Sequence, residues 1–443
     1  MLKYHFKTIL CIVAIAYTPS IAISQVKPVA TDTFLDSKPF IDWARHHALP
    51  LETSDSVTSN TDLMPLKKII GNARVVALGE PEHGLHELVE FRNRMFRFLV
   101  ENCGFTTIIL EANFAQSHYA ADYIGGSEAT AEEAAQKLTI GKPTKGNIEL
   151  LQWMRKYNAD KSHRRKLKFY GMDMEIQGFP GDTLPAHPAL DEALKYLSAV
   201  DSKEANKMTS ALEPYMTRLS VVKYPLLSME EHDRLSAILS DMTSLFERER
   251  IKYITATSKE KFEWAYHNTI VAQQTDKMIR VSPPDQPGQI PPEAWRLMST
   301  RDAAMAENVM WILNNEAEGG KVLVFAHNAH VKNAETFGSV WNAFAQPPNS
   351  TGQYLRSMLD SNLLIIGSSC APSLTTAQQG SLDSALSQVG KPRFLLDLRK
   401  ATNDDVVESW LKVKRPMEAN KVAFLLLQPL RAFDVLLFIN KAQ

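Results

Sequence analysis

Five ionisable side chains fall within eight consecutive residues of this chain. They are Glu80, Glu82, His83, His86 and Glu87. The apolar run 75–78 and Gly79 precede them, and a helical pattern follows. An imidazole has a pKa near neutrality and can take a proton from water, and a carboxylate on its other ring nitrogen strengthens that base. Open α/β sheets place their chemistry where a strand ends just before a helix, so this stretch predicts a catalytic site.

Three more apolar runs, residues 105–110, 166–171 and 321–326, also end in ionisable groups. The groups that follow them are Glu111, Asp173, His327 and His330. Parallel strands bring their carboxyl ends to one edge of a sheet, so we expect these side chains to meet His83 there. The alternative is that acids and imidazoles simply occupy loops, but their repetition at four strands favours convergence.

Arg92 adds a buried cation to this picture. On a helical wheel it lies about 40° from Leu88, inside the apolar stripe that Met95 and Leu99 continue. A guanidinium among core positions needs a carboxylate partner, which Glu80 or Glu111 could supply. The alternative is that the long side chain of Arg92 reaches solvent.

Two HxxH patterns, at 83–86 and 327–330, raise the possibility of a zinc site completed by a carboxylate. The pattern is weakly specific, because it lacks the HExxH spacing that puts two imidazoles on one helical face. The chain also has no GxSxG motif, so a serine nucleophile on a strand-to-helix elbow has no support. A histidine that activates water is what remains.

The elements that must position these groups predict a three-layer α/β/α sandwich with a mostly parallel, possibly mixed sheet. The expected strands are 75–78, 105–110, 166–171, 321–326, 362–367, 393–398, 421–428 and 433–439. The last two are separated by only a few residues, so we expect the C-terminal part of the sheet to be partly antiparallel. A first crossover helix starts near Leu85 and ends at Gly104, which suits a helix C-cap.

Residues 188–280 contain no strand runs and read as a helical insertion, followed by a proline-rich linker at 283–292. We therefore expect a catalytic core made of residues 25–187 and 281–443. The insertion is expected to cap the strand ends and to form an apolar cleft for a bulky substrate.

The N-terminus has the pattern of a secretory signal peptide. Lys3 and Lys7 precede the apolar run 9–17, and Ala22-Ile23-Ser24 supplies small residues for cleavage after Ser24. A membrane anchor needs about 20 apolar residues, which this run does not reach. The pattern predicts a protein exported to the periplasm, with residues 1–24 removed and no stable membrane anchor.

Composition narrows the class of partner. Lys and Arg number 49 against 50 for Asp and Glu, so no overall field attracts nucleic acid or an anionic membrane, and a small molecule is the expected partner. Of the three cysteines, Cys11 lies in the signal peptide. Cys103 and Cys370 remain, and two buried thiols are the expected state rather than a disulfide.

Several blocks of the sequence resemble the erythromycin esterase family. GEPEHG at 79–84, with Glu87 and Arg92, is similar to the GExxHG block of that family. The other similar blocks are FTTIILEANFA at 105–115, KFYGMDME at 168–175, TRDAAMAENVMW at 300–311, VFAHNAHV at 324–331 and PRFLLDLR at 392–399. They occur in the order of the family and span about residues 60–440, nearly the whole mature chain.

The resemblance implies a carboxylic ester hydrolase that opens the macrolactone of 14-membered macrolides such as erythromycin, with no metal or other cofactor. Carried over by motif, His83 is the general base, and its expected catalytic partners are Glu80, Glu111, Arg92 and His327. The expected substrate-binding residues are Asp173, Arg301 and His330.

These residues suggest one mechanism. His83 takes a proton from a water that attacks the ester carbonyl, and Glu80 or Glu111 orients the imidazole. Arg92 and His327 hold carboxylates or stabilise the oxyanion.

Two alternatives stay open from the sequence. One is a metal-dependent hydrolase of another ester. The other is an envelope polysaccharide biosynthesis protein without macrolide activity, because other members of the family are associated with exopolysaccharide biosynthesis.

Overall fold

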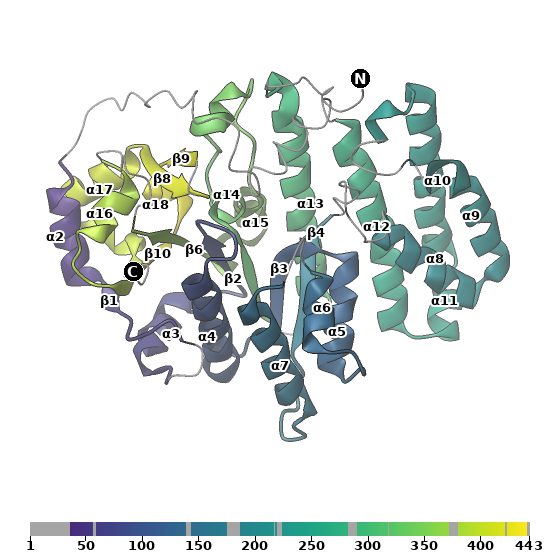
Figure 1. Cartoon of the computed structure of the whole chain (residues 1–443), viewed down its shortest axis with the longest axis horizontal. Helices are drawn as coiled ribbons and strands as arrows, with labels where there is room; N and C mark the ends of the chain where they lie inside the picture. Colours follow the sequence, from purple (N-terminus) through teal and green to yellow (C-terminus); the bar gives the residue numbers. More distant parts are fainter. Residues whose placement is uncertain are drawn as a thin grey trace.

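The computed structural model describes residues 36–440, except 56–58, 139–142, 175–186, 217, 219–223, 282–289, 318, 372–379 and 421–422. An eight-stranded sheet runs through its centre in the order β1-β7-β10-β6-β2-β5-β3-β4 (Figure 1). Its strands are β1 Leu49–Pro50, β2 Val75–Glu80, β3 Thr107–Asn113, β4 Lys168–Asp173, β5 Val322–His327, β6 Leu363–Cys370, β7 Arg393–Asp397 and β10 Val435–Ile439. The signal peptide predicted at residues 1–24, and most of the predicted linker, lie outside the described residues.

The sheet is parallel from β10 to β4, and β7 pairs antiparallel with both β10 and β1. The predicted α/β class with a mostly parallel, mixed sheet is therefore confirmed. The expected strand 421–428 does not join this sheet: β9 (Ala423–Leu427) pairs antiparallel with β8 (Arg415–Ala419) in a separate hairpin. After β9 the chain forms a helical turn, α18 (Pro429–Ala432). A tight β-turn at this place would have paired β9 with β10 as an antiparallel hairpin, whereas the helical turn leads the chain away from β9.

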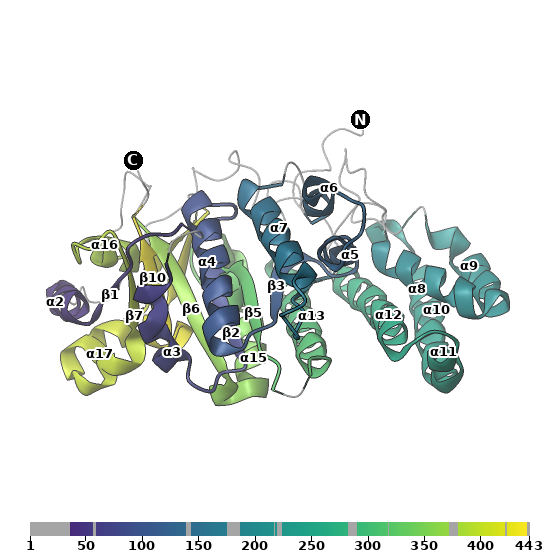
Figure 2. The same cartoon turned by 90° about the horizontal axis from the view of Figure 1, so that it is seen from below.

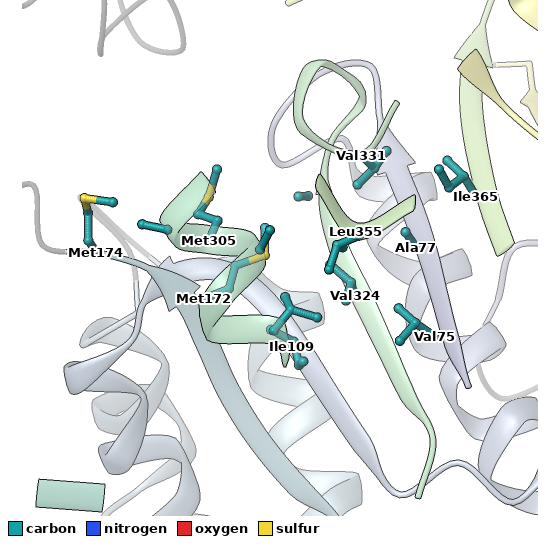
Figure 3. Packing of buried hydrophobic residues seen from close by; sticks show 14 of the residues in the cluster. Val75, Ala77, Ile109, Met172, Met174, Met305, Val324, Val331, Leu355 and Ile365 are labelled. Carbon is teal, nitrogen blue, oxygen red and sulfur yellow. The ribbon is translucent and has the colours of Figure 1, made fainter. Parts of the chain in front are cut away.

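Alternate residues of each buried strand face opposite layers, as the two-residue side-chain period of a strand requires. In β2, Val76 and Leu78 pack under α4 (His86–Cys103), whereas Val75 and Ala77 face the other layer. Figure 3 shows that second layer, where Ile109 of β3 and Val324 of β5 belong to the same buried cluster as Met305 of α13 (Trp295–Asn314).

Helices cover both faces of the sheet (Figure 2). On the side of α4 lie α3 Met64–Ile70, α5 His118–Gly125, α6 Ala131–Gln136 and α7 Lys145–Ala159. With α13 lie α2 Lys38–His47, α15 Thr351–Leu359, α16 Leu382–Ser387 and α17 Asp405–Lys412. Helix α4 ends at the left-handed Gly104, as predicted. Cys103 and Cys370 are both free thiols, as expected, but only Cys370 is buried, and Cys103 is partly exposed.

The residues between β4 and α13 form the predicted helical insertion. Its helices are α8 Pro188–Val200, α9 Ser202–Met216, α10 Met229–Arg248, α11 Arg250–Ala256 and α12 Lys259–Arg280. They lie beside the β4 edge of the sheet, where α12 packs on α13 (Figures 1 and 2). Within the described part of the chain, no helix is long and apolar enough to cross a membrane.

Candidate active site

Four parallel strands that are consecutive in the sheet, β2, β5, β3 and β4, end at one edge. Glu80 is the last residue of β2 and lies in register with His327, the last residue of β5. Glu111 lies near the end of β3, and Asp173 ends β4. The expected convergence of these side chains is confirmed.

A β-bulge places Glu111. The register between β3 and β4 passes from Leu110–Gly171 to Asn113–Asp173, so β3 has one residue more than its partner over this stretch. A Cβ atom on Gly171 would overlap the backbone of Ala112 and Asn113. The glycine therefore makes room for the bulge, and bulges near active sites commonly re-aim a side chain.

A second close approach fixes the end of β2. A Cβ atom on Gly79 would overlap the side-chain amide of Asn328. That amide donates to the carbonyl of Ser368 at 2.7 Å and accepts from its N–H at 3.1 Å. Gly79 thus allows the chain after β5 to bind β6 directly across β2, next to Glu80.

His83 is positioned by Glu80. Its Nδ1 lies 2.8 Å from Glu80 Oε1, and the Glu80 side chain is 7% exposed. Burial lowers the pKa of His83, but the charges of Glu111 and Glu80 and the hydrogen bond to Glu80 outweigh burial, so the pKa is raised. The His83 side chain is 25% exposed, and no described residue forms a hydrogen bond with its Nε2.

His327 is held as a neutral imidazole by the backbone. Its Nδ1 accepts from the N–H of Ala329 at 3.2 Å, so its Nε2 carries the proton and donates to the carbonyl of Pro81 at 3.1 Å. Burial, together with the nearby His83, lowers the pKa of His327 to about 3. Its ring centroid lies 5.1 Å from that of His83. His327 therefore braces the loop that carries His83.

The three residues expected to bind substrate form one buried ion network with Glu111. Arg301 donates to both carboxylate oxygens of Asp173, with Nη2 at 2.6 Å from Oδ2, and to Glu111 Oε1 at 3.2 Å. His330 Nε2 lies 3.3 Å from the same Glu111 oxygen. The other oxygen, Glu111 Oε2, accepts the backbone N–H of His327 at 2.9 Å.

The protonation of the Glu111–Asp173 pair is uneven. Burial raises the pKa of Glu111, but His330, His83 and Arg301 outweigh it and lower the pKa well below its usual value. Burial raises the pKa of Asp173, and Arg301 offsets only part of that effect. Contact of Asp173, Arg301 and His330 with substrate stays a prediction. In the structure, Arg301 contacts Asp173, and both Arg301 and His330 contact Glu111.

Arg92 is buried, as the helical wheel predicted, and it does not reach solvent. The expected ion pair with Glu80 or Glu111 is not among the ion pairs of the described residues. Instead, Arg92 Nε and Nη2 donate to Asn93 Oδ1 at 3.1 and 2.7 Å, and the guanidinium lies over the ring of Phe325, 5.0 Å from its centroid. Burial lowers the pKa of Arg92 to about 10, and only the more distant charge of Glu80 opposes it. A side-chain amide and an aromatic face thus take the place of the carboxylate that sequence reasoning required.

The two HxxH patterns do not place four imidazoles together. His86 begins α4 with a side chain that is 62% exposed, and it pairs with Glu90 at 3.3 Å. Across the part of the chain that the structure describes, no group of three or more His, Cys, Asp or Glu side chains has an arrangement that could hold a metal ion.

Sequence reasoning missed two residues next to the site. Asp302 follows Arg301 on α13 and lies 2.9 Å from His330 Nδ1, and its place in the TRD block was the available signal. Asn420, at the tip of the β8–β9 hairpin, donates its N–H to Pro81 O at 2.8 Å and accepts from His83 N at 3.4 Å. No local pattern marks Asn420, because its role depends on tertiary contact with the His83 loop.

The arrangement suits proton transfer from water. His83 has one ring nitrogen held by a buried carboxylate and the other without a protein partner among the described residues. The neutral His327 and the Arg301–Glu111–His330 network surround it with fixed dipoles and charges. A general base of this kind needs a carboxylate to orient it, which Glu80 supplies, and the pKa of His83 is raised above the ordinary value of an imidazole.

Known proteins resemble this chain in sequence and in fold. The family model described as erythromycin esterase matches residues 100–442. An Escherichia coli protein named erythromycin esterase type II is 28% identical over 303 residues, which cover 66% of this chain and 69% of that protein. A solved structure of a Bacillus cereus protein superposes with a TM-score of 0.78 at 26% identity, covering 92% of this chain and 98% of the other.

A second solved structure, named as a succinoglycan biosynthesis protein, superposes with a TM-score of 0.76 at 23% identity. It covers 93% of this chain and 98% of its own, which shows a shared fold. The family model alone spans well over half of the sequence. The chain therefore belongs to the erythromycin esterase family and is a hydrolase of that type.

Proposed function

We propose that this hydrolase opens the macrolactone ester of 14-membered macrolides such as erythromycin, with His83 as the general base. The observation that carries the proposal is the pairing of His83 Nδ1 with the buried Glu80 carboxylate at 2.8 Å. This pairing leaves Nε2 as the ring nitrogen without a hydrogen-bond partner among the described residues. The 28% identity to a protein named erythromycin esterase type II supports the choice of substrate.

In the proposed reaction, His83 Nε2 takes a proton from a water as its oxygen attacks the ester carbonyl carbon. Glu80 holds the proton on Nδ1 and stabilises the imidazolium that forms. When the tetrahedral intermediate collapses, the imidazolium returns the proton to the departing alkoxide. The products are a carboxylic acid and an alcohol within one opened ring.

His327 and Arg92 act indirectly in this proposal. His327 already donates its Nε2 proton to Pro81 O, so it supports the loop of His83. Arg92 contributes a buried positive charge that interacts with Glu80 through space, without a direct contact. Glu111 keeps a negative charge near His83, which supports the imidazolium as it forms.

We propose that the reaction needs no metal ion. The carboxylates that would attract a cation already face one: Arg301 binds both Asp173 and Glu111. A sample dialysed against a chelator and shown metal-free by elemental analysis should keep full activity. Loss of activity that returns with added zinc would instead support a metal-dependent hydrolase.

The helical insertion is proposed to set the range of substrates. Phe114, which follows β3, donates its N–H to Asp173 O at 2.8 Å and stacks on Trp264 of α12, with centroids 4.9 Å apart. One aromatic pair thus joins the strand ends to the insertion. Exchanging residues 188–280 for those of a relative should change substrate preference, and retention of the parental preference would exclude this role.

Export to the periplasm is a further part of the proposal, because the N-terminal pattern is that of a signal peptide. Fractionation of cells that express the full chain, followed by mass determination of the protein, should place it in the periplasm with Gln25 as its first residue. Full-length protein in the cytoplasm would contradict this prediction.

The central test is incubation of the protein with erythromycin and related 14-membered macrolides. Mass spectrometry should show addition of one water, and His83→Ala should lower the rate by at least about 100-fold, the lower end of what a general base contributes. Circular dichroism must show that the variant is folded. Wild-type turnover by folded His83→Ala, or no ring opening of any macrolide by the wild type, would overturn the proposal.

A further inference from the structure

Asp302 is a buried carboxylate to which the proposed mechanism gives no role. It lies on α13 directly after Arg301 and is 3% exposed. A single oxygen, Oδ1, receives three donors: Nδ1 of His330 at 2.9 Å, and the N–H and hydroxyl of Thr351 at 2.7 and 2.9 Å. Three donors on one oxygen hold this carboxylate in one orientation.

This geometry fixes one proton of His330 and places the other ring nitrogen between two charged groups. Its Nδ1 must carry a proton in order to donate to Asp302. Its Nε2 lies 3.3 Å from Glu111 Oε1, whose charge favours a second proton there, and 3.2 Å from Arg301 Nη1, whose charge opposes it. Burial lowers the pKa of His330, but Asp302 and Glu111 outweigh burial and raise the pKa to about 10.

The positive charge of His330 affects the proposed base, His83, through its effect on Glu111. His330 and Arg301 both contact Glu111 Oε1, so two cations hold this carboxylate in its ionised form. Glu111 in turn accepts the N–H of His327 and acts on His83 through its charge. Direct contacts thus connect Asp302 to His330 and His330 to Glu111. Glu111 then acts on the proposed base, His83, through its charge and without a direct contact.

The other charged groups near His330 come from every element packed against it. They are Glu111 on β3, Asp173 on β4, Arg301 and Asp302 on α13, Lys332 after α14 (Asn328–Val331), and the imidazoles of His83 and His327. Lys332 is fully buried and donates to Ala329 O at 2.8 Å and to Thr336 Oγ1 at 2.7 Å, so it does not compete for His330.

From this arrangement we propose that Asp302 is a positioning residue that holds His330 as an imidazolium and thereby fixes the charge and place of Glu111. Asp302 does not touch the substrate in this role. The consequence for rate rests on the proposed function, whereas the protonation of His330 does not.

The first test reads the protonation of His330 directly in the wild-type protein. NMR of protein labelled in its histidine rings, with the His330 signal assigned from His330→Gln, should show an imidazolium at pH 8, well above the ordinary pKa of about 6.5. A neutral His330 at this pH would overturn the proposal without any variant of Asp302.

The second test compares Asp302→Asn with Thr351→Val. Asp302→Asn keeps an oxygen that can accept from His330 Nδ1 but removes the charge, so the apparent proton affinity of His330 should fall at least tenfold. Thr351→Val removes one donor to the same oxygen and leaves the carboxylate and its contact with His330, so it should stay within about threefold of wild type. An unchanged titration of His330 in Asp302→Asn would contradict the proposal.

Kinetics then separate positioning from substrate binding. Asp302→Asn should lower kcat on the hydrolysed macrolide at least tenfold with KM within about twofold, and its effect should largely disappear in a His330→Gln background. An unchanged kcat, or a change confined to KM, would contradict a positioning role. If His330 titrates as expected but no macrolide is hydrolysed by wild type, the proposed function fails and the assignment of Asp302 stands.

Discussion

Nδ1 of His83 lies 2.8 Å from Oε1 of Glu80, a residue only three positions earlier that ends strand β2. The other oxygen of Glu80 is buried and has no hydrogen-bond partner among the described residues. Because its surroundings offer no alternative donor, the buried carboxylate of Glu80 is expected to keep this one contact and so to hold the His83 ring in one orientation. Orientation of the proposed base is thus encoded within one short stretch of chain.

The first prediction concerns pH. Since the pKa of His83 is raised, its neutral form, which is the base, should predominate only above a pKa higher than the ordinary value of about 6.5. The rate kcat/KM should therefore rise with pH through that raised pKa. Glu80→Gln removes the charge and weakens the hydrogen bond that raise it, so the rise should move to lower pH and the plateau rate should fall at least tenfold.

Glu90→Gln is the matched control, because it removes a nearby carboxylate that pairs with the exposed His86. Its pH profile should coincide with that of the wild type. A profile that stays in place in Glu80→Gln would show that this carboxylate does not set the pKa of the base.

The sequence predicts the site well where strand order alone decides the geometry. Glu80, Glu111, Asp173 and His327 each follow an apolar run, and parallel pairing necessarily brings such residues to one edge. Arg92 shows where this reasoning stops: the wheel predicted its burial, but its partners, Asn93 and Phe325, depend on how α4 packs on the sheet.

Contacts between segments that lie far apart in the sequence were harder to predict. Asp302 meets His330 only because α13 packs beside α14 (Asn328–Val331), and Asn420 meets Pro81 only because β8 and β9 leave the main sheet. The apolar run of β9 is indistinguishable from that of a sheet strand by periodicity alone, which is why its pairing was predicted wrongly.

A second prediction concerns the bulge that places Glu111. Gly171→Ala puts a methyl group into the backbone of Ala112 and Asn113, so the bulge must move. We expect a loss of about 1–3 kcal/mol in the free energy of unfolding, as for other overpacked sites, and at least a tenfold loss of kcat as Glu111 shifts. Chemical denaturation and steady-state kinetics measure both effects.

Gly125→Ala serves as the control, because a Cβ atom there meets nothing within 4 Å. This variant should keep wild-type activity. If Gly171→Ala also keeps wild-type activity and stability, the close approach of β4 to the bulge does not determine the position of Glu111.

The third prediction concerns Asn420, which adopts a left-handed backbone conformation with φ of 53°. Asn420→Gly relieves that conformation and removes the side-chain oxygen that accepts from His83 N, whereas Asn420→Ala removes the oxygen and keeps the strain. Both variants should lower kcat/KM several-fold, and the alanine variant should be less stable than the glycine variant by about 1–2 kcal/mol, the cost of a left-handed residue.

Asp360→Gly relieves a similar conformation, with φ of 46°, at the end of α15. It should leave kcat/KM unchanged, since it is not among the residues that contact the site. Wild-type kcat/KM in both Asn420 variants would show that the hairpin does not position the His83 loop.

The last prediction concerns stability, through a buried ion pair far from the chemistry. Arg94 is fully buried on α4, where it donates to both oxygens of Asp62 and to the carbonyls of Thr53 at 2.7 Å and Ser59 at 2.6 Å. Asp62→Asn leaves the guanidinium without its counter-charge and should cost about 3–5 kcal/mol in the free energy of unfolding.

The stability contributed by the Asp62–Arg94 ion pair depends on pH with a definite sign. Burial raises the pKa of Asp62, but the hydrogen bonds from Arg94 and the Glu52 N–H, together with the charge of Arg94, lower it overall. This contribution is therefore present above the unfolded pKa of about 3.9 and is lost as pH falls through the lowered folded value. Urea denaturation at pH 7 and pH 3 should show the gap between wild type and Asp62→Asn narrowing in acid, and a gap that stays constant would show that the carboxylate charge is not what stabilises this contact.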